Sequence, residues 1–135
     1  MRDDPRYAEG VRLFQQGHYF ETHEVLELAW RACPAGSDKQ FLQGLIQLAV
    51  SLEHWRRGNP RGARGQWDKA RAKLEPLPGA YGGLRLGALL RAFEAWYRLR
   101  GIDAAVIEQA EGRYVAAVEG GAWPAPEWDA DAPEP

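Results

Sequence analysis

Apolar residues recur along the chain every three or four positions, which is the spacing of amphipathic α-helices. No stretch shows the alternation of apolar and polar residues that is typical of a half-buried strand. The pattern therefore predicts an all-α fold of about six helices. The predicted helices span residues 5–16, 19–32, 38–57, 60–75, 84–100 and 103–120.

Signals for helix starts agree with these boundaries. Asp4–Pro5 and Asn59–Pro60 each combine an N-cap residue with proline at the first helical position. Ser37 with Gln40 predicts a capping box at the start of the third helix, and Asp103 predicts the cap of the sixth.

An internal repeat follows the turn glycines Gly17, Gly58 and Gly101, which are 41 and 43 residues apart. The copies correspond at offsets of 5, 9 and 12 residues from each glycine. In the first two copies, small residues at 5 and 12 permit close approach of two helices, and a large residue at 9 fills the groove between them. The third copy is degraded. The matched positions are Thr22, Leu26 and Ala29, then Ala63, Trp67 and Ala70, then Val106, Ala110 and Arg113. We expect an antiparallel stack of three helical hairpins, similar to tetratricopeptide repeats but without their period of about 34 residues.

The chain of 135 residues is long enough for one helical domain, which we place at residues 1–120. Residues 121–135, "GAWPAPEWDADAPEP", are rich in proline and acid and are expected to be disordered, although Trp123 and Trp128 could dock on the domain. Four of the 19 acidic residues lie in this tail, so residues 1–126 carry 17 basic and 15 acidic side chains. The domain itself is therefore close to neutral.

A single cysteine, Cys33, excludes an internal disulfide and any CxxC metal or redox motif. The sequence also has no secretory leader and no apolar run long enough to cross a membrane. These features predict a cytoplasmic protein that does not contact membranes.

Polar residues interrupt the apolar faces of the second and third helices. At about 100° per residue, Phe20, His23, Glu27 and Trp30 share one face of the second helix, with Glu24 at its edge. On the third helix, the polar stripe consists of Gln43, Gln47 and His54. A hairpin folded near Ala35 places residue 23 opposite residue 47 and residue 27 opposite residue 43. We therefore expect a polar cluster between the two helices, walled by Phe20, Trp30 and Phe41.

Three interpretations of this cluster remain open. It can be a structural hydrogen-bond network, a pocket for a small molecule or peptide, or an acid/base or metal site. The run "HEVLE" has Glu27 where an HExxH motif has its second histidine. His54 falls about 10 Å beyond the partner of His23, which is too far for a shared ion, so no metal ligands are assigned.

A second candidate is the basic stretch from Arg56 to Lys73, which contains Trp67 and follows Trp55. Such a stretch can follow phosphates and stack a base. The alternative is a solvated helix face with Trp67 in the core, and the near-neutral domain favours this alternative.

The runs "GHYFETHEVLELAW" and "FLQGLIQLA" resemble the bacterial and archaeal family known as domain of unknown function 309, over roughly residues 7–77. The resemblance implies a small all-helical domain whose most characteristic positions lie in the two runs. These positions are His23, Glu24, Glu27, Trp30, Gln43 and Gln47. It implies no activity.

The favoured interpretation is a binding or scaffolding module without a cofactor. Its expected partner is a small molecule or a protein, and the module could form a homodimer. Its predicted binding residues are Phe20, His23, Glu24, Glu27, Trp30, Gln43 and Gln47. The alternative is a small metal-assisted or acid/base hydrolase, with His23, Glu24 and Glu27 as candidate catalytic residues. Weak nucleic-acid binding through Arg56–Lys73 is the third hypothesis.

Overall fold

The computed structural model describes residues 1–113, 120–132 and 134–135, and the regular elements in these residues are six helices. The prediction of an all-α fold is confirmed. The helices are α1 (Pro5–Gln15), α2 (Tyr19–Ala32), α3 (Ser37–Arg56), α4 (Pro60–Leu74), α5 (Leu86–Leu99) and α6 (Ile102–Ala110). The part of the sixth predicted helix at residues 114–119 lies outside the described residues.

Two of the predicted caps are confirmed and two differ. The side chain of Asp4 accepts a hydrogen bond from the Arg6 amide, and that of Asn59 accepts one from the Gly62 amide. The third helix instead begins after Gly36, so Ser37 is already helical. The sixth begins after Gly101, whose left-handed backbone (φ 63°) turns the chain two residues before Asp103.

The first two predicted hairpins form as expected. Gly17 (φ 80°) and Gly58 (φ 78°) adopt the left-handed backbone that lets the chain reverse after α1 and after α3. The repeat positions in both copies are buried: Thr22, Leu26 and Ala29 on α2, and Ala63, Trp67 and Ala70 on α4, where Trp67 packs against α5. The repeat read from the sequence thus marks buried faces of α2 and α4.

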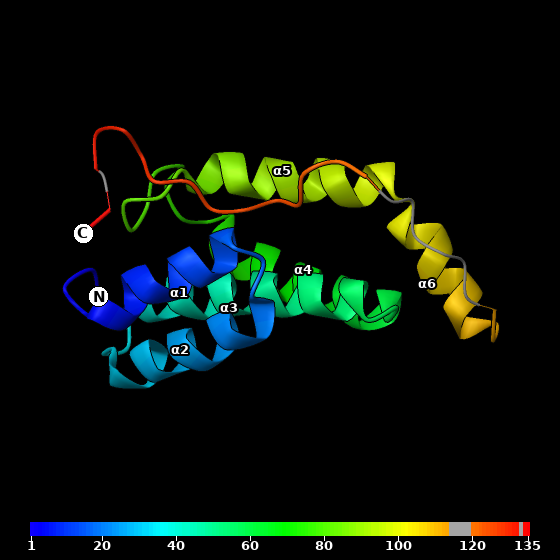
Figure 1. The fold of residues 1–135 in the computed structure, drawn as a ribbon, viewed down its shortest axis with the longest axis horizontal. Coiled ribbons are helices and arrows are strands. Elements are labelled where there is room, and N and C mark those ends of the chain that lie inside the picture. Colours follow the sequence, from blue (N-terminus) through cyan, green and yellow to red (C-terminus); the bar gives the residue numbers. More distant parts are fainter. Residues whose placement is uncertain (114–119, 133) are drawn as a thin grey trace.

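Helices α1 to α4 form one layer in which α1 packs on α2, α2 on α3, and α3 on α4 (Figure 1). Helix α5 lies over this layer, and both chain termini lie at the same end of the molecule (Figure 1). Helix α6 packs against α4 and points away from α5, which is where the third copy differs from the first two. The degraded repeat in α6 is the sequence counterpart of this difference.

Aromatic rings fill the space between α5 and the layer below it. Phe93 of α5 stacks on Trp67 of α4, with ring centroids 5.4 Å apart, and meets Phe14 of α1 edge-on at 6.3 Å. Trp96 and Tyr97 of α5 pack on Trp55 of α3 at 5.9 and 5.5 Å. Because these rings are large, α5 is held mainly by side chains and not by close backbone approach.

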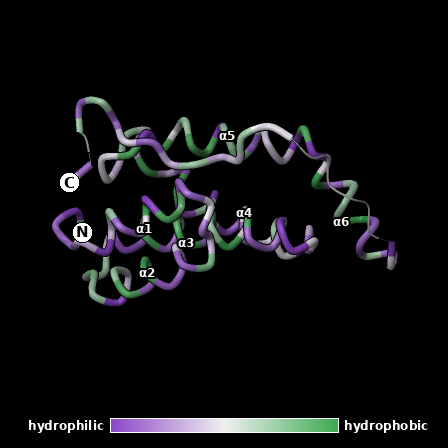
Figure 2. The backbone as a smooth tube through the Cα atoms, viewed as in Figure 1, coloured by the Kyte–Doolittle hydropathy of each residue, from purple (hydrophilic) through white to green (hydrophobic). Residues whose placement is uncertain are grey.

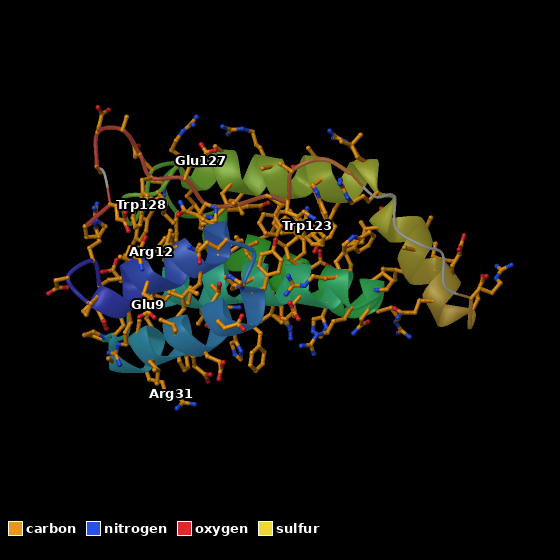
Figure 3. The ribbon with its side chains drawn as sticks, in the orientation of Figure 1. Glu9, Arg12, Arg31, Trp123, Glu127 and Trp128 are labelled. Carbon is orange, nitrogen blue, oxygen red and sulfur yellow. The ribbon has the colours of Figure 1, made fainter. Side chains whose placement is uncertain are left out.

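Part of the C-terminal segment lies against the domain, through the two tryptophans for which the sequence analysis allowed docking. Residues 122–129 run along α5 and over α1, and Trp123 and Trp128 lie in the space between these layers (Figures 1 and 3). Trp128 meets Tyr7 edge-on at 5.8 Å, and Trp123 packs on Trp96 at 4.6 Å. Composition favours disorder for an isolated segment, but it does not register the aromatic partners that the folded domain supplies.

Hydrophilic residues interrupt every helix (Figure 2). Among the described residues, no helix combines the length and the hydropathy needed to span a bilayer.

Candidate functional site

The predicted polar cluster forms only in part. Nε2 of His23 lies 3.6 Å from Oε2 of Glu27, one turn further along α2, and Oε1 of Glu27 accepts a hydrogen bond of 3.0 Å from Arg31. The His23 and Glu27 side chains keep 37% and 36% of their surface exposed. These groups therefore form a partly solvated polar row along α2 and not a buried network.

The other predicted members do not converge on this pair. Glu24 is exposed, and Trp30 lies under the ammonium group of Lys39, with Nζ 4.5 Å from the ring centroid. Phe41 is fully buried and packs on Tyr7 and Tyr81, away from His23. The helical pattern placed His23, Glu27 and Trp30 on one face of α2, but it did not indicate which part of that face meets a neighbouring helix.

The two glutamines of the predicted stripe are partly buried on α3. Oε1 of Gln47 is buried without a hydrogen-bond partner. An unpaired buried acceptor costs about 1–3 kcal/mol.

A groove of about 370 Å³ lies between the N-terminal half of α2 and the C-terminal half of α3, and we call it the α2–α3 groove. It is lined by both His23 and His54, which the sequence analysis placed too far apart to share an ion. Its lining residues are Tyr19, Phe20, His23, Ile46, Val50, Glu53, His54, Arg57 and Gln66. Phe20 and His23 are the predicted binding residues that it contains.

The α2–α3 groove combines apolar walls with polar groups. Ile46 and Val50 come from successive turns of α3, so they line the same side. Phe20 is 49% exposed, and its ring meets that of His23 at 6.4 Å. An aromatic side chain this exposed beside a groove offers apolar surface to a ligand.

Asn59 fixes the tautomer of neutral His54. The Asn59 Oδ1 accepts from the Gly62 amide at 3.0 Å, so Nδ2 is the atom that faces Nδ1 of His54 at 3.2 Å. Because an amide nitrogen can only donate, Nδ1 of His54 is the acceptor, and the ring proton lies on Nε2. The cap of α4 thereby leaves Nε2 of His54, a residue that lines the groove, as a hydrogen-bond donor.

The acidic group of the groove is neutralised by its neighbours. Glu53 forms ion pairs with Arg56 and Arg57, the latter at 2.8 Å. Arg56 also donates to the Gly17 carbonyl at 2.8 Å, and its guanidinium lies over the Tyr19 ring at 4.8 Å. One carboxylate between two guanidinium groups leaves this end of the groove electropositive.

Tyr19 forms the boundary between the groove and the C-terminal segment. It lines the α2–α3 groove, and its ring also packs on Trp123 at 5.9 Å. Burial raises the pKa of the Tyr19 hydroxyl to about 12, so this group is uncharged at neutral pH.

Within the described ranges, no group of three or more histidine, cysteine, aspartate and glutamate side chains is arranged to hold a metal ion.

The groove residues missed by the sequence analysis include both apolar and polar side chains. Ile46, Val50 and Tyr19 read as ordinary core positions, and Glu53 and Gln66 as ordinary surface positions. The signal that could have found them is the position of His54 near the end of α3, opposite the start of α2 in the antiparallel hairpin.

The basic stretch is built differently from a base-stacking surface. Trp55 and Trp67 are buried against α5, so neither ring is open to stack on a base. Arg64 and Arg71 form ion pairs with Asp68 at 3.2 and 2.9 Å. This arrangement agrees with a solvated helix face that has Trp67 in the core.

Comparison with known proteins identifies one family model, described as a domain of unknown function (DUF309), which matches residues 7–66. The matched segment runs from α1 into the middle of α4 and includes all residues of the α2–α3 groove. It ends before the limit of residue 77 expected from the sequence.

Two relatives support the match. Uncharacterized protein YpuF of Bacillus subtilis (strain 168) is 50% identical over 46 residues, which are 34% of this chain and 26% of that protein. An uncharacterized protein of Aquifex aeolicus (strain VF5) is 27% identical over 88 residues, or 65% of this chain and 26% of the relative. The chain thus spans about a quarter of the length of each. These matches agree with the resemblance seen in the sequence: residues 7–66 match the model of the domain of unknown function DUF309.

Proposed function

We propose that the protein is a binding module whose α2–α3 groove takes a small ligand with an apolar body and an acidic head group. The observation that carries the proposal is the groove itself, in which half-exposed Phe20 stands beside His23 and His54.

Size and lining support a small ligand. Pockets for small molecules typically enclose about 300–1,000 Å³ and are lined mainly by apolar side chains with a few polar groups. The groove has about 370 Å³, with Ile46 and Val50 among its apolar residues. A ligand of this size that covers the Phe20 ring removes apolar surface from water, which is the main source of its affinity.

Charge and hydrogen-bond donors support an acidic head group. His54 carries its ring proton on Nε2, and Arg57 adds a guanidinium at the same end. Glu53 does not oppose an anion strongly because two arginines already neutralise it. A carboxylate would therefore gain charge-assisted hydrogen bonds here.

The test is a ligand-observed NMR screen with benzoate, indole-3-acetate and octanoate, each beside its methyl ester. We expect the acids to bind the wild-type protein and the esters to bind more weakly. Phe20→Ala should reduce affinity about tenfold, whereas Leu28→Ala should leave it unchanged. Leu28 is the matched control because it is 47% exposed on the same helix and does not line the groove.

Equal binding of acids and esters would contradict the acidic head group. Equal loss in Phe20→Ala and Leu28→Ala, or no binding by any of the three acids, would contradict the groove as the binding site. Circular dichroism of both variants separates these outcomes from a loss of fold.

A second candidate, acid/base hydrolysis, is favoured by the pairing of His23 with Glu27 at 3.6 Å beside the groove. In this role His23 would remove a proton from water, and Glu27 would stabilise the resulting imidazolium. Glu27→Gln should then lower turnover of an activated ester while leaving binding of the carboxylic acids intact. Unchanged turnover in this variant would contradict it.

A further inference from the structure

The described C-terminal segment contacts the domain in the manner of a bound peptide. We call residues 122–129 the C-terminal strap. The Arg85 amide donates to the Glu127 carbonyl at 2.9 Å, and the Asp129 amide donates to the Gly83 carbonyl at 2.7 Å. Between these two bonds, Leu84 and Trp128 pair as an isolated antiparallel bridge. The strap thus adds itself to an exposed edge of backbone, as peptides do in strand addition.

Side chains anchor the strap at both ends. Trp128 meets Tyr7 edge-on at 5.8 Å, and Trp123 lies on Trp96 at 4.6 Å. Pro124 and Pro126 are buried between the two tryptophans. Because proline fixes its backbone near the extended polyproline conformation, the segment loses little further entropy when it docks.

A side-chain hydrogen bond from the domain contacts the middle of the strap. Nε2 of Gln15, on α1, donates to the Pro126 carbonyl at 2.9 Å. Acidic side chains of the described C-terminal residues form exposed ion pairs, Glu127 with Arg85 at 3.2 Å and, beyond the strap, Glu134 with Arg12 at 3.4 Å. Exposed pairs of this kind contribute about 0–1 kcal/mol, so recognition rests on the tryptophans, prolines and main-chain bonds.

The fit of the strap is incomplete. A cavity of about 350 Å³ remains beside it, bordered by Trp123 and Ala125 of the strap and by Phe14, Tyr19 and Arg56 of the domain. The Trp123 ring is 38% exposed. An anchor that leaves this much space and surface holds the segment less tightly than a closed core would.

We propose that the surface formed by α1, α5 and residues 82–85 is a peptide-binding site for an extended segment of the pattern Trp-Pro-x-Pro-x-Trp. The strap occupies this site as an intramolecular ligand, and a segment of the same pattern on a partner chain competes with it. The proposal is independent of the α2–α3 groove and of the ligand proposed for that groove.

The test uses a fluorescein-labelled peptide of residues 121–135, titrated by fluorescence anisotropy into full-length wild-type protein and into full-length Trp128→Ala. A tethered segment competes at an effective concentration in the millimolar range, so wild type should bind the peptide weakly. Trp128→Ala weakens the strap but leaves the receiving surface unchanged. We expect it to bind the peptide at least tenfold more tightly than wild type.

Two controls identify the determinants. A peptide with both tryptophans replaced by alanine should not bind Trp128→Ala. Adding Gln15→Ala to Trp128→Ala should weaken binding of the wild-type peptide about threefold to tenfold, since one hydrogen bond contributes about 1 kcal/mol. Both results are expected only if the peptide occupies the site of the strap.

The proposal fails if a folded Trp128→Ala protein binds the wild-type peptide no better than the tryptophan-free peptide. Trp123→Ala replaces Trp128→Ala in the titration if the latter does not fold, because Trp123 is the more exposed anchor. Equal affinity of the wild type and of the tested tryptophan variant for the peptide would show that the peptide binds a different surface, and this would also overturn the proposal.

Discussion

Ser51 on α3 and Tyr97 on α5 join the two layers through a buried hydrogen bond, with their hydroxyl oxygens 2.6 Å apart. Ser51 Oγ also lies 2.7 Å from the Ala63 carbonyl, which can only accept. The single Ser51 proton therefore goes to Ala63, and Tyr97 donates to Ser51. This chain of two bonds connects α5, α3 and α4 in the aromatic core.

Removing either hydroxyl should destabilise the protein to different extents. Tyr97→Phe removes the donor and leaves Ser51 bonded to Ala63, so we expect a loss of about 1 kcal/mol. Ser51→Ala leaves the Tyr97 hydroxyl buried without an acceptor, which should cost about 1–3 kcal/mol. The free energy of unfolding in urea measures both.

The double variant Ser51→Ala, Tyr97→Phe gives the coupling between the two hydroxyls. We expect it to be more stable than the sum of the single losses predicts, because no hydroxyl is left unpaired. Strict additivity would contradict the buried bond.

Gly10 on α1 should not tolerate a side chain. A Cβ at this position would lie 2.5 Å from Cγ of Leu26, which is fully buried on α2 and has no space to move. We expect Gly10→Ala to cost about 1–3 kcal/mol, although alanine is the better helix former. Thermal unfolding followed by circular dichroism is the measurement.

Gly65→Ala is the matched control for this substitution. Gly65 is exposed in the interior of α4, and a Cβ there meets nothing within 4 Å. We expect a gain of up to about 1 kcal/mol from helix propensity alone. Similar losses in both variants would show that close packing at Gly10 is not the cause.

The elements and turns could be predicted from the sequence because their causes are local. Gly17 and Gly58 turn the chain by their own backbone freedom, and Asn59 caps α4 with its own side chain. The repeat placed Leu26 in the groove between the first two helices, but its partner Gly10 was not predicted because the register of α1 against α2 is not a local property.

The candidate site was predicted only in part because amphipathic spacing does not give the limits of a contact. Leu26 and His23 share a face of α2, yet Leu26 is buried against α1 while His23 lies about 60° around the helix at the open groove. The sequence allowed Trp128 to dock but did not identify its partner, because Tyr7 lies 121 residues earlier in the chain.

Stability should fall at alkaline pH through the buried tyrosines. Burial raises the pKa of Tyr19 from its ordinary value of 10.0 to about 12, and it raises the pKa of Tyr97 further. The folded protein holds these protons more tightly than the unfolded chain does. The free energy of unfolding that the protonated tyrosines contribute is therefore fully present below pH 10, and it is lost as the pH rises from 10 towards 12.

Tyr19→Phe isolates one of these contributions. We expect the free energy of unfolding to fall less steeply between pH 10 and 12 in this variant, by on the order of 1–2 kcal/mol, because one pKa unit corresponds to about 1.4 kcal/mol. Urea unfolding at a series of pH values measures the slope. Identical slopes for wild type and variant would mean that Tyr19 ionises equally easily in both states.

Asn59 links the stability of α4 to the orientation of His54, and two substitutions separate these roles. Asn59→Ala removes the cap of the Gly62 amide and should cost about 1 kcal/mol. Asn59→Asp keeps a cap oxygen, so stability should be close to that of wild type. Its second carboxylate oxygen can only accept, however, so His54 must now carry a proton on Nδ1 to bond to it.

The ¹⁵N chemical shifts of the His54 ring report this difference directly. In wild type we expect the neutral ring to be protonated on Nε2, and in Asn59→Asp we expect the proton on Nδ1. If Nε2 donates a hydrogen bond to the acidic ligand proposed for the α2–α3 groove, then Asn59→Asp should weaken carboxylate binding without loss of fold. Wild-type His54 protonated on Nδ1 would contradict the assigned hydrogen bond and remove this argument for an acidic head group.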